Sequence, residues 1–260
     1  MAGIFDSYKK IYENKKIHIW LFIIALLWTV SSFMFDIATG RPNNPGQNIF
    51  DILFGIFTGV YSLQFLHNAI HNINGGVLPS FKEIKGKTFV DMIKLDIVWF
   101  FYAIIIIMTS VVLYFTLIHT IIFPIAIISL TVLAAMFVYY IYIAYAENME
   151  TKGLFNIVLL FRFIKPAFKD TLIKVCIFIL ATLLAVLICI LIYAAAAITG
   201  LDTIGHVAAD YYVLDFIIFI IAAYFMVVTW YFAYPYSLID TYIEKIRPLL
   251  RKEENNGENV

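Results

Sequence analysis

The feature that most constrains this chain is a run of 50 residues, Ile97 to Ala146, that contains no Asp, Glu, Lys or Arg. A helix needs about 20 apolar residues to cross a hydrocarbon core of about 30 Å, so this run is more than twice as long as one crossing. It therefore predicts two membrane-spanning helices joined by a turn. We place the turn near His119 and Thr120, because Pro124 then lies in the first turn of the returning helix, where its missing N–H is not needed.

The apolar composition extends this interpretation to the whole chain. Of its 260 residues, 63% are hydrophobic and 14% are charged, whereas soluble proteins average about 45–50% apolar and about 25% charged residues. Backbone groups inside a bilayer have no water to bond, so uncharged runs of this length fold as helices. We expect an all-α polytopic membrane protein, a bundle of six transmembrane helices. The expected spans are residues 17–35, 52–66, 97–118, 121–145, 175–199 and 212–234.

The basic residues predict how the bundle is oriented. All of the 18 Lys and Arg except Arg41 lie before the first span, after the last span, or in the second and fourth connections. Because cytoplasmic loops carry the excess of Lys and Arg, both termini are expected in the cytoplasm. The expected organisation is a cytoplasmic amphipathic segment at 1–16, the six-span domain at 17–240 and a cytoplasmic tail at 241–260.

Amphipathic stretches are expected as cytoplasmic connectors. Within residues 4–12, apolar side chains recur at i, i+1, i+4, i+7 and i+8, the pattern of one helix face. Mixed apolar and basic stretches also occur at 81–93, 155–168 and 242–250. Such segments lie on a membrane surface, where they either cover the ends of the bundle or recognise lipid headgroups. The layout also fits three repeats of a two-span unit, although any membrane entry has a similar pattern.

The most distinctive stretch is Gly59 to Lys94, GVYSLQFLHNAIHNINGGVLPSFKEIKGKTFVDMIK. A span runs through polar positions into Gly75-Gly76 and Leu78-Pro79, and a short amphipathic segment follows. Together with residues 4–16 and 155–170, this layout resembles a family of bacterial and archaeal integral membrane proteins known only as a domain of unknown function. The resemblance implies a location in the prokaryotic cytoplasmic (inner) membrane, and it implies no established activity.

A polar cluster is expected at the cytoplasmic end of the second span, where the family has basic residues instead of histidines. His67 and His71 are four residues apart, as are Asn68 and Asn72, so each pair shares a helix face. A zinc site needs three or four ligands, and no third His, Cys or Glu accompanies the pair locally. We predict hydrogen bonding or helix capping around the two glycines; the alternatives are a metal site and a pocket for a small molecule or headgroup. The candidate interaction positions are His67, Asn68, His71, Asn72, Gly75, Gly76, Pro79 and Asp215.

Gly55 and Gly59 form a GxxxG pattern in the second span. Small residues at this spacing let another helix approach closely. The approaching helix belongs either to the same bundle or, in self-association, to a second copy of the chain. We expect packing within the bundle.

Acidic residues are sparse within the spans. Asp215 lies about one turn inside the sixth span and is either a functional buried acid or an anchor at the outer interface. Glu147 and Glu150 follow the fourth span and lie near Lys152, so we expect them on a solvated face. The interiors of the spans therefore give no sign of an ion relay.

No catalytic pattern is present in the sequence. It has no phosphate-binding glycine loop, no nucleophile elbow and no cluster of carboxylates in one loop, and its zero net charge argues against a nucleic-acid partner. We predict a non-enzymatic accessory or scaffold component of the cell envelope or of a transport system, without a cofactor. The alternative is a transporter or channel for a small or lipid-like molecule. The expected partners are the lipid bilayer and other membrane proteins.

Overall fold

The computed structural model describes residues 4–13, 15–39, 45–118, 120, 122–151, 154–155, 157–198 and 207–251, and all regular structure in them is helical. The predicted all-α class is therefore confirmed. The elements are α1 (Ile4–Tyr12), α2 (Lys15–Thr39), α3 (Pro45–Ile70), η1 (Ile73–Gly76), η2 (Phe81–Glu83), α4 (Gly86–Leu117), α5 (Ile122–Asn148), α6 (Ile157–Ile198), α7 (Val207–Met226), η3 (Val227–Ala233), α8 (Tyr234–Thr241) and η4 (Tyr242–Ile246). Of the short elements, η1 and η2 are 3-10 helices, and η3 and η4 are π-helical turns.

Three helical stretches in the described part of the chain are long and apolar enough to cross a membrane: Gly86–Leu117, Lys165–Ala195 and Phe216–Arg251. They contain most of the predicted third, fifth and sixth spans. The predicted first, second and fourth spans fall on α2, α3 and α5, which have 25, 26 and 27 residues. In the residues that the structure describes, these three helices do not meet the same requirement of length and apolarity, so the structure supports three of the six predicted spans.

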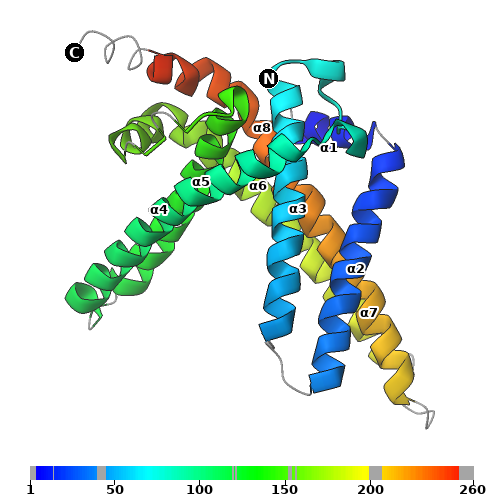
Figure 1. Ribbon diagram of the computed structural model, residues 1–260. Helices are drawn as coiled ribbons and strands as arrows, with labels where there is room; N and C mark the ends of the chain where they lie inside the picture. Colours follow the sequence, from blue (N-terminus) through cyan, green and yellow to red (C-terminus); the bar gives the residue numbers. More distant parts are fainter. Residues whose placement is uncertain are drawn as a thin grey trace.

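The helices form two groups that meet at one end of the molecule (Figure 1). α2 packs against α3 and α7, α4 packs against α5, and α3 contacts both α4 and α5. Away from this junction the α4–α5 hairpin diverges from α2, α3 and α7 (Figure 1). α6 packs against α5 and α8. We call the junction the α1 end, because α1, the connector 71–85 and η4 all lie there.

Buried side chains are concentrated in the half of the molecule nearest the α1 end. The largest ones come from the second half of α3, the second half of α5, α6 and the stretch 227–246: Tyr61, Phe65, Tyr140, Tyr145, Phe178, Phe232, Tyr234 and Tyr242. Among the described residues, the last buried position of α4 is Tyr102 and the last of α6 is Phe178. Beyond these two points the described side chains of both helices are exposed or only partly buried.

Three of the four predicted connectors are continuous with the helices that they precede or follow. α6 runs for 42 residues through Pro166, a length of about 63 Å. α4 starts at Gly86 within the connector predicted at 81–93, and the helix of α8 continues through η4 to Arg251. The helices cross the predicted boundaries between connectors and spans because the sequence there lacks strong helix terminators. Pro166 removes one hydrogen bond of α6 without ending the helix. The start of the predicted tail at 241–260 is likewise helical and packed.

α1 is a separate helix and is fastened to the bundle by hydrogen bonds. The hydroxyl groups of Tyr8 and Thr229 are 3.1 Å apart, and burial raises the pKa of the Tyr8 hydroxyl, so this group stays protonated. His18 Nε2 donates to the Ile11 carbonyl at 2.8 Å. Ile11 is fully buried whereas Phe5 is 89% exposed. α1 thus has one face on the bundle and one face free. The buried face differs from the predicted one, because Phe5 and Tyr12 of the apolar face are exposed and Ser7 is fully buried.

Candidate functional site

His67 and His71 cap the end of α5. Their ring centroids are 4.6 Å apart. His67 Nδ1 is 2.7 Å from the Ala146 carbonyl oxygen, and His71 Nε2 is 2.8 Å from the Glu147 carbonyl oxygen. Both carbonyls lie in the last turn of a helix that ends at Asn148, where carbonyl groups lack intrahelical donors. The histidines therefore cap a neighbouring helix, and no group of three or more His, Cys, Asp or Glu in the described part of the chain could hold a metal ion.

The predicted turn after α3 uses left-handed backbone. Asn72, Gly75 and Gly76 have φ angles of 52°, 73° and 68°. The positive φ favours glycine at Gly76, whereas a Cβ there would lie 3.4 Å from the Ala69 Cα, which is ordinary contact. The Gly75 carbonyl accepts a hydrogen bond from Lys10 Nζ at 3.2 Å. The glycines thus fold the connector back over the end of α3 and bring it into contact with α1.

Asn68 and Pro79 fasten the connector to α3. The Pro79 carbonyl accepts a hydrogen bond from the Tyr61 hydroxyl. Glu83 accepts hydrogen bonds from the backbone N–H and the hydroxyl of Ser80, each at 3.0 Å, and from the Asn68 amide at 3.4 Å. Asn68 is 2% exposed, and its amide oxygen also accepts from Gln64 Nε2 at 3.0 Å, so both the donor and the acceptor of this buried amide have partners.

Glu147 forms a buried ion pair, which corrects the prediction that it lies on a solvated face. Its side chain is 8% exposed, and its Oε1 lies 2.6 Å from Arg247 Nη2. The Tyr242 hydroxyl donates to Oε2 at 2.5 Å. Glu147 is buried because the helix through η4 packs over the end of α5, whereas Glu150 remains exposed. The carboxylate therefore joins α5 to the C-terminal helix.

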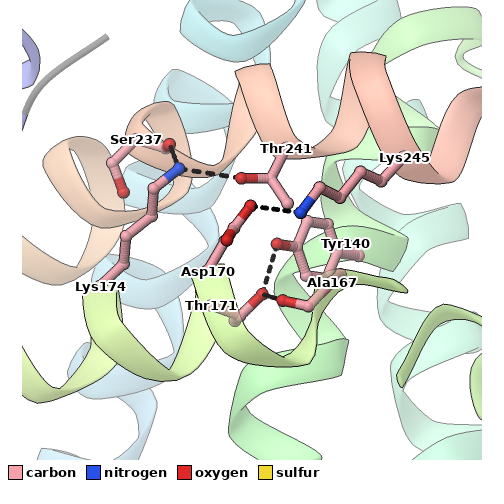
Figure 2. Close-up of polar contacts among 8 residues, drawn as sticks. All are labelled: Tyr140, Ala167, Asp170, Thr171, Lys174, Ser237, Thr241 and Lys245. Carbon is pink, nitrogen blue, oxygen red and sulfur yellow. Dashed lines mark hydrogen bonds and ion pairs between the residues drawn. The ribbon is translucent and has the colours of Figure 1, made fainter. Parts of the chain in front are cut away.

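A second polar cluster joins α6 to α8 and η4 (Figure 2). Lys174 Nζ donates to the Ser237 carbonyl and, at 3.0 Å, to the Thr241 hydroxyl. One turn earlier in α6, Asp170 pairs with Lys245 at 2.6 Å. The two lysines come from different helices and reach across the same interface in opposite directions.

The same cluster extends to α5. The hydroxyl groups of Tyr140 and Thr171 are 2.6 Å apart, and Thr171 donates to the Ala167 carbonyl at 2.7 Å (Figure 2). Both Tyr140 and Thr171 are fully buried. Polar side chains therefore connect α5, α6 and the C-terminal helix at the α1 end, where the apolar core is also densest.

The C-terminal helix contains a break at η3 that neighbouring hydroxyl groups satisfy. Pro235 has no N–H, so it cannot bond the Tyr231 carbonyl four residues earlier or the Trp230 carbonyl five residues earlier. Ser62 of α3 donates to the Tyr231 carbonyl, and Tyr139 of α5 donates to the Trp230 carbonyl at 3.1 Å. An unsatisfied carbonyl in hydrocarbon costs several kcal/mol, so these contacts stabilise the π-helical turn before the proline.

This interpretation predicts coupling between Ser62 and Pro235. We expect Ser62→Ala to lower the free energy of unfolding by about 1 kcal/mol in the natural chain. In a Pro235→Ala background the restored N–H bonds the Tyr231 carbonyl, so the same substitution should have almost no effect. Unfolding by dodecyl sulfate in mixed micelles measures both differences. Ser110→Ala is the control, because Ser110 bonds the Ile106 carbonyl of its own helix and should behave alike in both backgrounds. Equal effects of Ser62→Ala in both backgrounds would contradict the interpretation.

A cavity of about 500 Å³ lies between α3, α4, α5 and η3. This volume is in the range of small-molecule sites. Its described lining consists of Ile52, Gly55, Ile56, Gly59, Met92, Asp96, Trp99, Tyr139, Tyr142 and Tyr231. A Cβ at Gly59 would lie 2.6 Å from Met92 Cε, whereas a Cβ at Gly55 would meet nothing within 4 Å. The GxxxG face is therefore directed at α4 of the same chain and at this cavity.

The structure brings together most of the predicted site residues and adds three that the sequence did not indicate. The predicted positions at the end of α3 lie together and fasten helix ends and the connector. Asp215 lies in α7, and its side chain is outside the described part of the structure. Sequence reasoning missed Asp96, the buried state of Glu147 and the role of Lys174. Asp96 and Lys174 each stand immediately before a predicted span, and this position was the available signal that they enter the bundle.

Comparisons of the chain with protein-family models, with curated proteins and with solved structures found no match. The function of the site is therefore inferred from its own geometry.

Proposed function

We propose that this chain is a six-span membrane protein that acts as a non-enzymatic accessory or scaffold component of the cell envelope or of a transport system. Its spans would be α2, α3, α4, α5, α6 and the helix from α7 to α8. The α1 end would face the cytoplasm, because the Lys- and Arg-rich segments gather there. Single cysteines at Asn44 and Thr203 test this topology; labelling of both from the cytoplasm alone would contradict it. The family resemblance and the prokaryotic cytoplasmic membrane remain predictions.

The observation that carries this proposal is the exposed apolar surface of α4 and α6. Only 11% of the most apolar 18-residue window of each helix is buried inside the chain, against 44% for Phe216–Arg251. The polar networks and the core fasten these helices at the α1 end only. Helices in a bilayer associate through packing and hydrogen bonds, because lipid is as apolar as their side chains. The exposed apolar surface of α4 and α6 away from the α1 end is therefore available to another membrane protein, which could pack between or beside these helices.

Crosslinking in native membranes tests the accessory role. A photoreactive amino acid is placed at Ile107 of α4 or at Leu187 of α6, which are 60% and 50% exposed, with Leu27 of α2, 62% exposed, as the matched control. We expect one protein to be captured from both test positions and not from the control. Native mass spectrometry of the gently purified complex should then show that protein at a fixed ratio to this chain. Lipid adducts alone at all three positions would contradict the proposal.

A transporter or channel for a small or lipid-like molecule is the second candidate. The cavity beside Asp96 favours it, since charged residues within spans commonly mark a substrate pathway. This function predicts that the protein moves a labelled lipid or solute across reconstituted vesicles and that Gly55→Leu, which fills the cavity, blocks the movement. Vesicles with unchanged permeability would leave the accessory role as the better proposal.

A further inference from the structure

Asp96 extends into the cavity without a partner of opposite charge. Its side chain is partly buried. No hydrogen bond or ion pair from any residue that the structure describes reaches its carboxylate. The nearest lysine in the sequence, Lys94, pairs instead with Asp91 at 3.0 Å. A carboxylate in apolar surroundings is costly unless an opposite charge compensates it.

We infer that the cavity binds an ammonium group carried on an apolar chain, with Asp96 as its counter-ion. This inference concerns a ligand of the chain itself, and it holds whether or not a partner protein covers α4 and α6.

The rest of the lining favours a cation over an anion. Tyr139 and Tyr142 donate their hydroxyl protons to the carbonyls of Trp230 and Gly59, at 3.1 and 2.7 Å. These two phenols therefore offer the cavity acceptor oxygens and aromatic rings, and no free proton. Aromatic rings attract ammonium groups through their quadrupole, and Trp99 adds the ring type with the strongest attraction. The other two donors in the described lining, the Trp99 indole N–H and the Tyr231 hydroxyl, are neutral, and this lining contains no Lys, Arg or His. An anion would therefore meet the Asp96 carboxylate without a positive charge to compensate it.

The opposite wall suits the apolar part of such a ligand. Ile52 and Ile56 of α3 and Met92 of α4 line the cavity, and the missing side chain of Gly55 leaves room beside them. The cavity lies among the helices predicted to span the membrane, so a ligand with an apolar chain can enter from the bilayer. A fully hydrated small cation would leave these apolar walls unfilled.

Binding of hexylammonium to the protein in phosphatidylglycerol nanodiscs tests the inference. The titration is followed by calorimetry, and the signal of empty nanodiscs is subtracted. We expect saturable binding that Asp96→Asn weakens by at least about tenfold. Asp96→Asn should still fold, since it removes an unpaired charge and keeps the side-chain volume. Hexan-1-ol, which has the same chain without the charge, should bind wild type and Asp96→Asn equally weakly.

Two further variants distinguish binding inside the cavity from a general effect of substitution or of surface charge on hexylammonium binding. Gly55→Leu should fold, because nothing lies within 4 Å of a Cβ there, and should abolish hexylammonium binding by filling the cavity. Glu150→Gln removes an exposed carboxylate outside the cavity and should bind like wild type. Thermal unfolding checks that each variant is folded. Equal affinity of wild type, Asp96→Asn and Gly55→Leu for hexylammonium, or equal affinity of wild type for the amine and the alcohol, would overturn the inference.

The source of the ammonium group is distinguished by adding phosphatidylethanolamine to the nanodiscs. If the headgroup of this lipid is the natural ligand, it competes, the apparent affinity for hexylammonium falls, and native mass spectrometry finds the lipid retained by wild type and lost from Asp96→Asn. If a free amine is the natural ligand, the affinity is the same in both membranes. Both results support the ammonium site. Loss of the crosslinked protein partner, by contrast, would bear only on the accessory role.

Discussion

Replacing Glu147 with glutamine is expected to lower the free energy of unfolding by about 3 kcal/mol. The substitution keeps the side-chain volume and an oxygen that can accept from Tyr242, but it leaves the Arg247 guanidinium without its counter-ion. Removing one partner of a buried pair typically costs about 3–5 kcal/mol, because the remaining charge is stranded. We expect the lower end of this range, since Arg247 retains 23% exposure. Unfolding by dodecyl sulfate in mixed micelles, followed by circular dichroism, gives the difference.

Glu150→Gln is the matched control for this prediction. Glu150 is exposed and lies three residues after Glu147, so its substitution should change stability by less than about 0.5 kcal/mol. Replacing Glu147 and Arg247 together with leucine should recover most of the loss, because apolar residues can substitute for a buried pair when both charges go. Equal losses for Glu147→Gln and Glu150→Gln would show that the pair does not stabilise the protein.

The helical class and the α4–α5 hairpin could be predicted because they depend on local properties of the sequence. The uncharged run from Ile97 to Ala146 required a turn near its middle, and α4 ends at Leu117 while α5 begins at Ile122. A long uncharged run predicts membrane-spanning helices from its own composition, whichever helices later pack beside it. For the same reason the amphipathic pattern of residues 4–12 was sufficient to predict α1.

The polar contacts depend on which helices become neighbours, and no local pattern contains that information. Glu147 and Arg247 are far apart in the sequence, and the former was flanked by Glu150, so its surroundings looked solvated. The histidine pair was expected to stabilise a helix end, yet the helix is α5 rather than α3, because only the packed bundle places Ala146 beside His67. Asp96 lies between the predicted connector at 81–93 and the predicted span at 97–118, and only the packing of α3, α4, α5 and η3 places it in the cavity.

Replacing Lys174 with methionine is expected to lower the free energy of unfolding by about 2 kcal/mol. Methionine retains an apolar stem, so the main loss is the charged donor to the Ser237 carbonyl and the Thr241 hydroxyl. Hydrogen bonds to charged groups contribute about 1.5–3 kcal/mol. The Asp170–Lys245 pair still connects the same helices, which limits the loss. The measurement is the same mixed-micelle unfolding, with Lys169→Met, at an exposed position of α6, as control.

The position of Lys174 also makes its effect local. It joins α6 to α8 at the α1 end, whereas α4 is held mainly by α3 and α5, so loss of the contact should loosen α6 more than α4. We therefore expect Lys174→Met to reduce protein crosslinking from Leu187 of α6 while crosslinking from Ile107 of α4 is preserved. A parallel fall at both positions would indicate general unfolding or poor membrane insertion instead. Unchanged stability relative to Lys169→Met would show that the cluster in Figure 2 does not fasten α6.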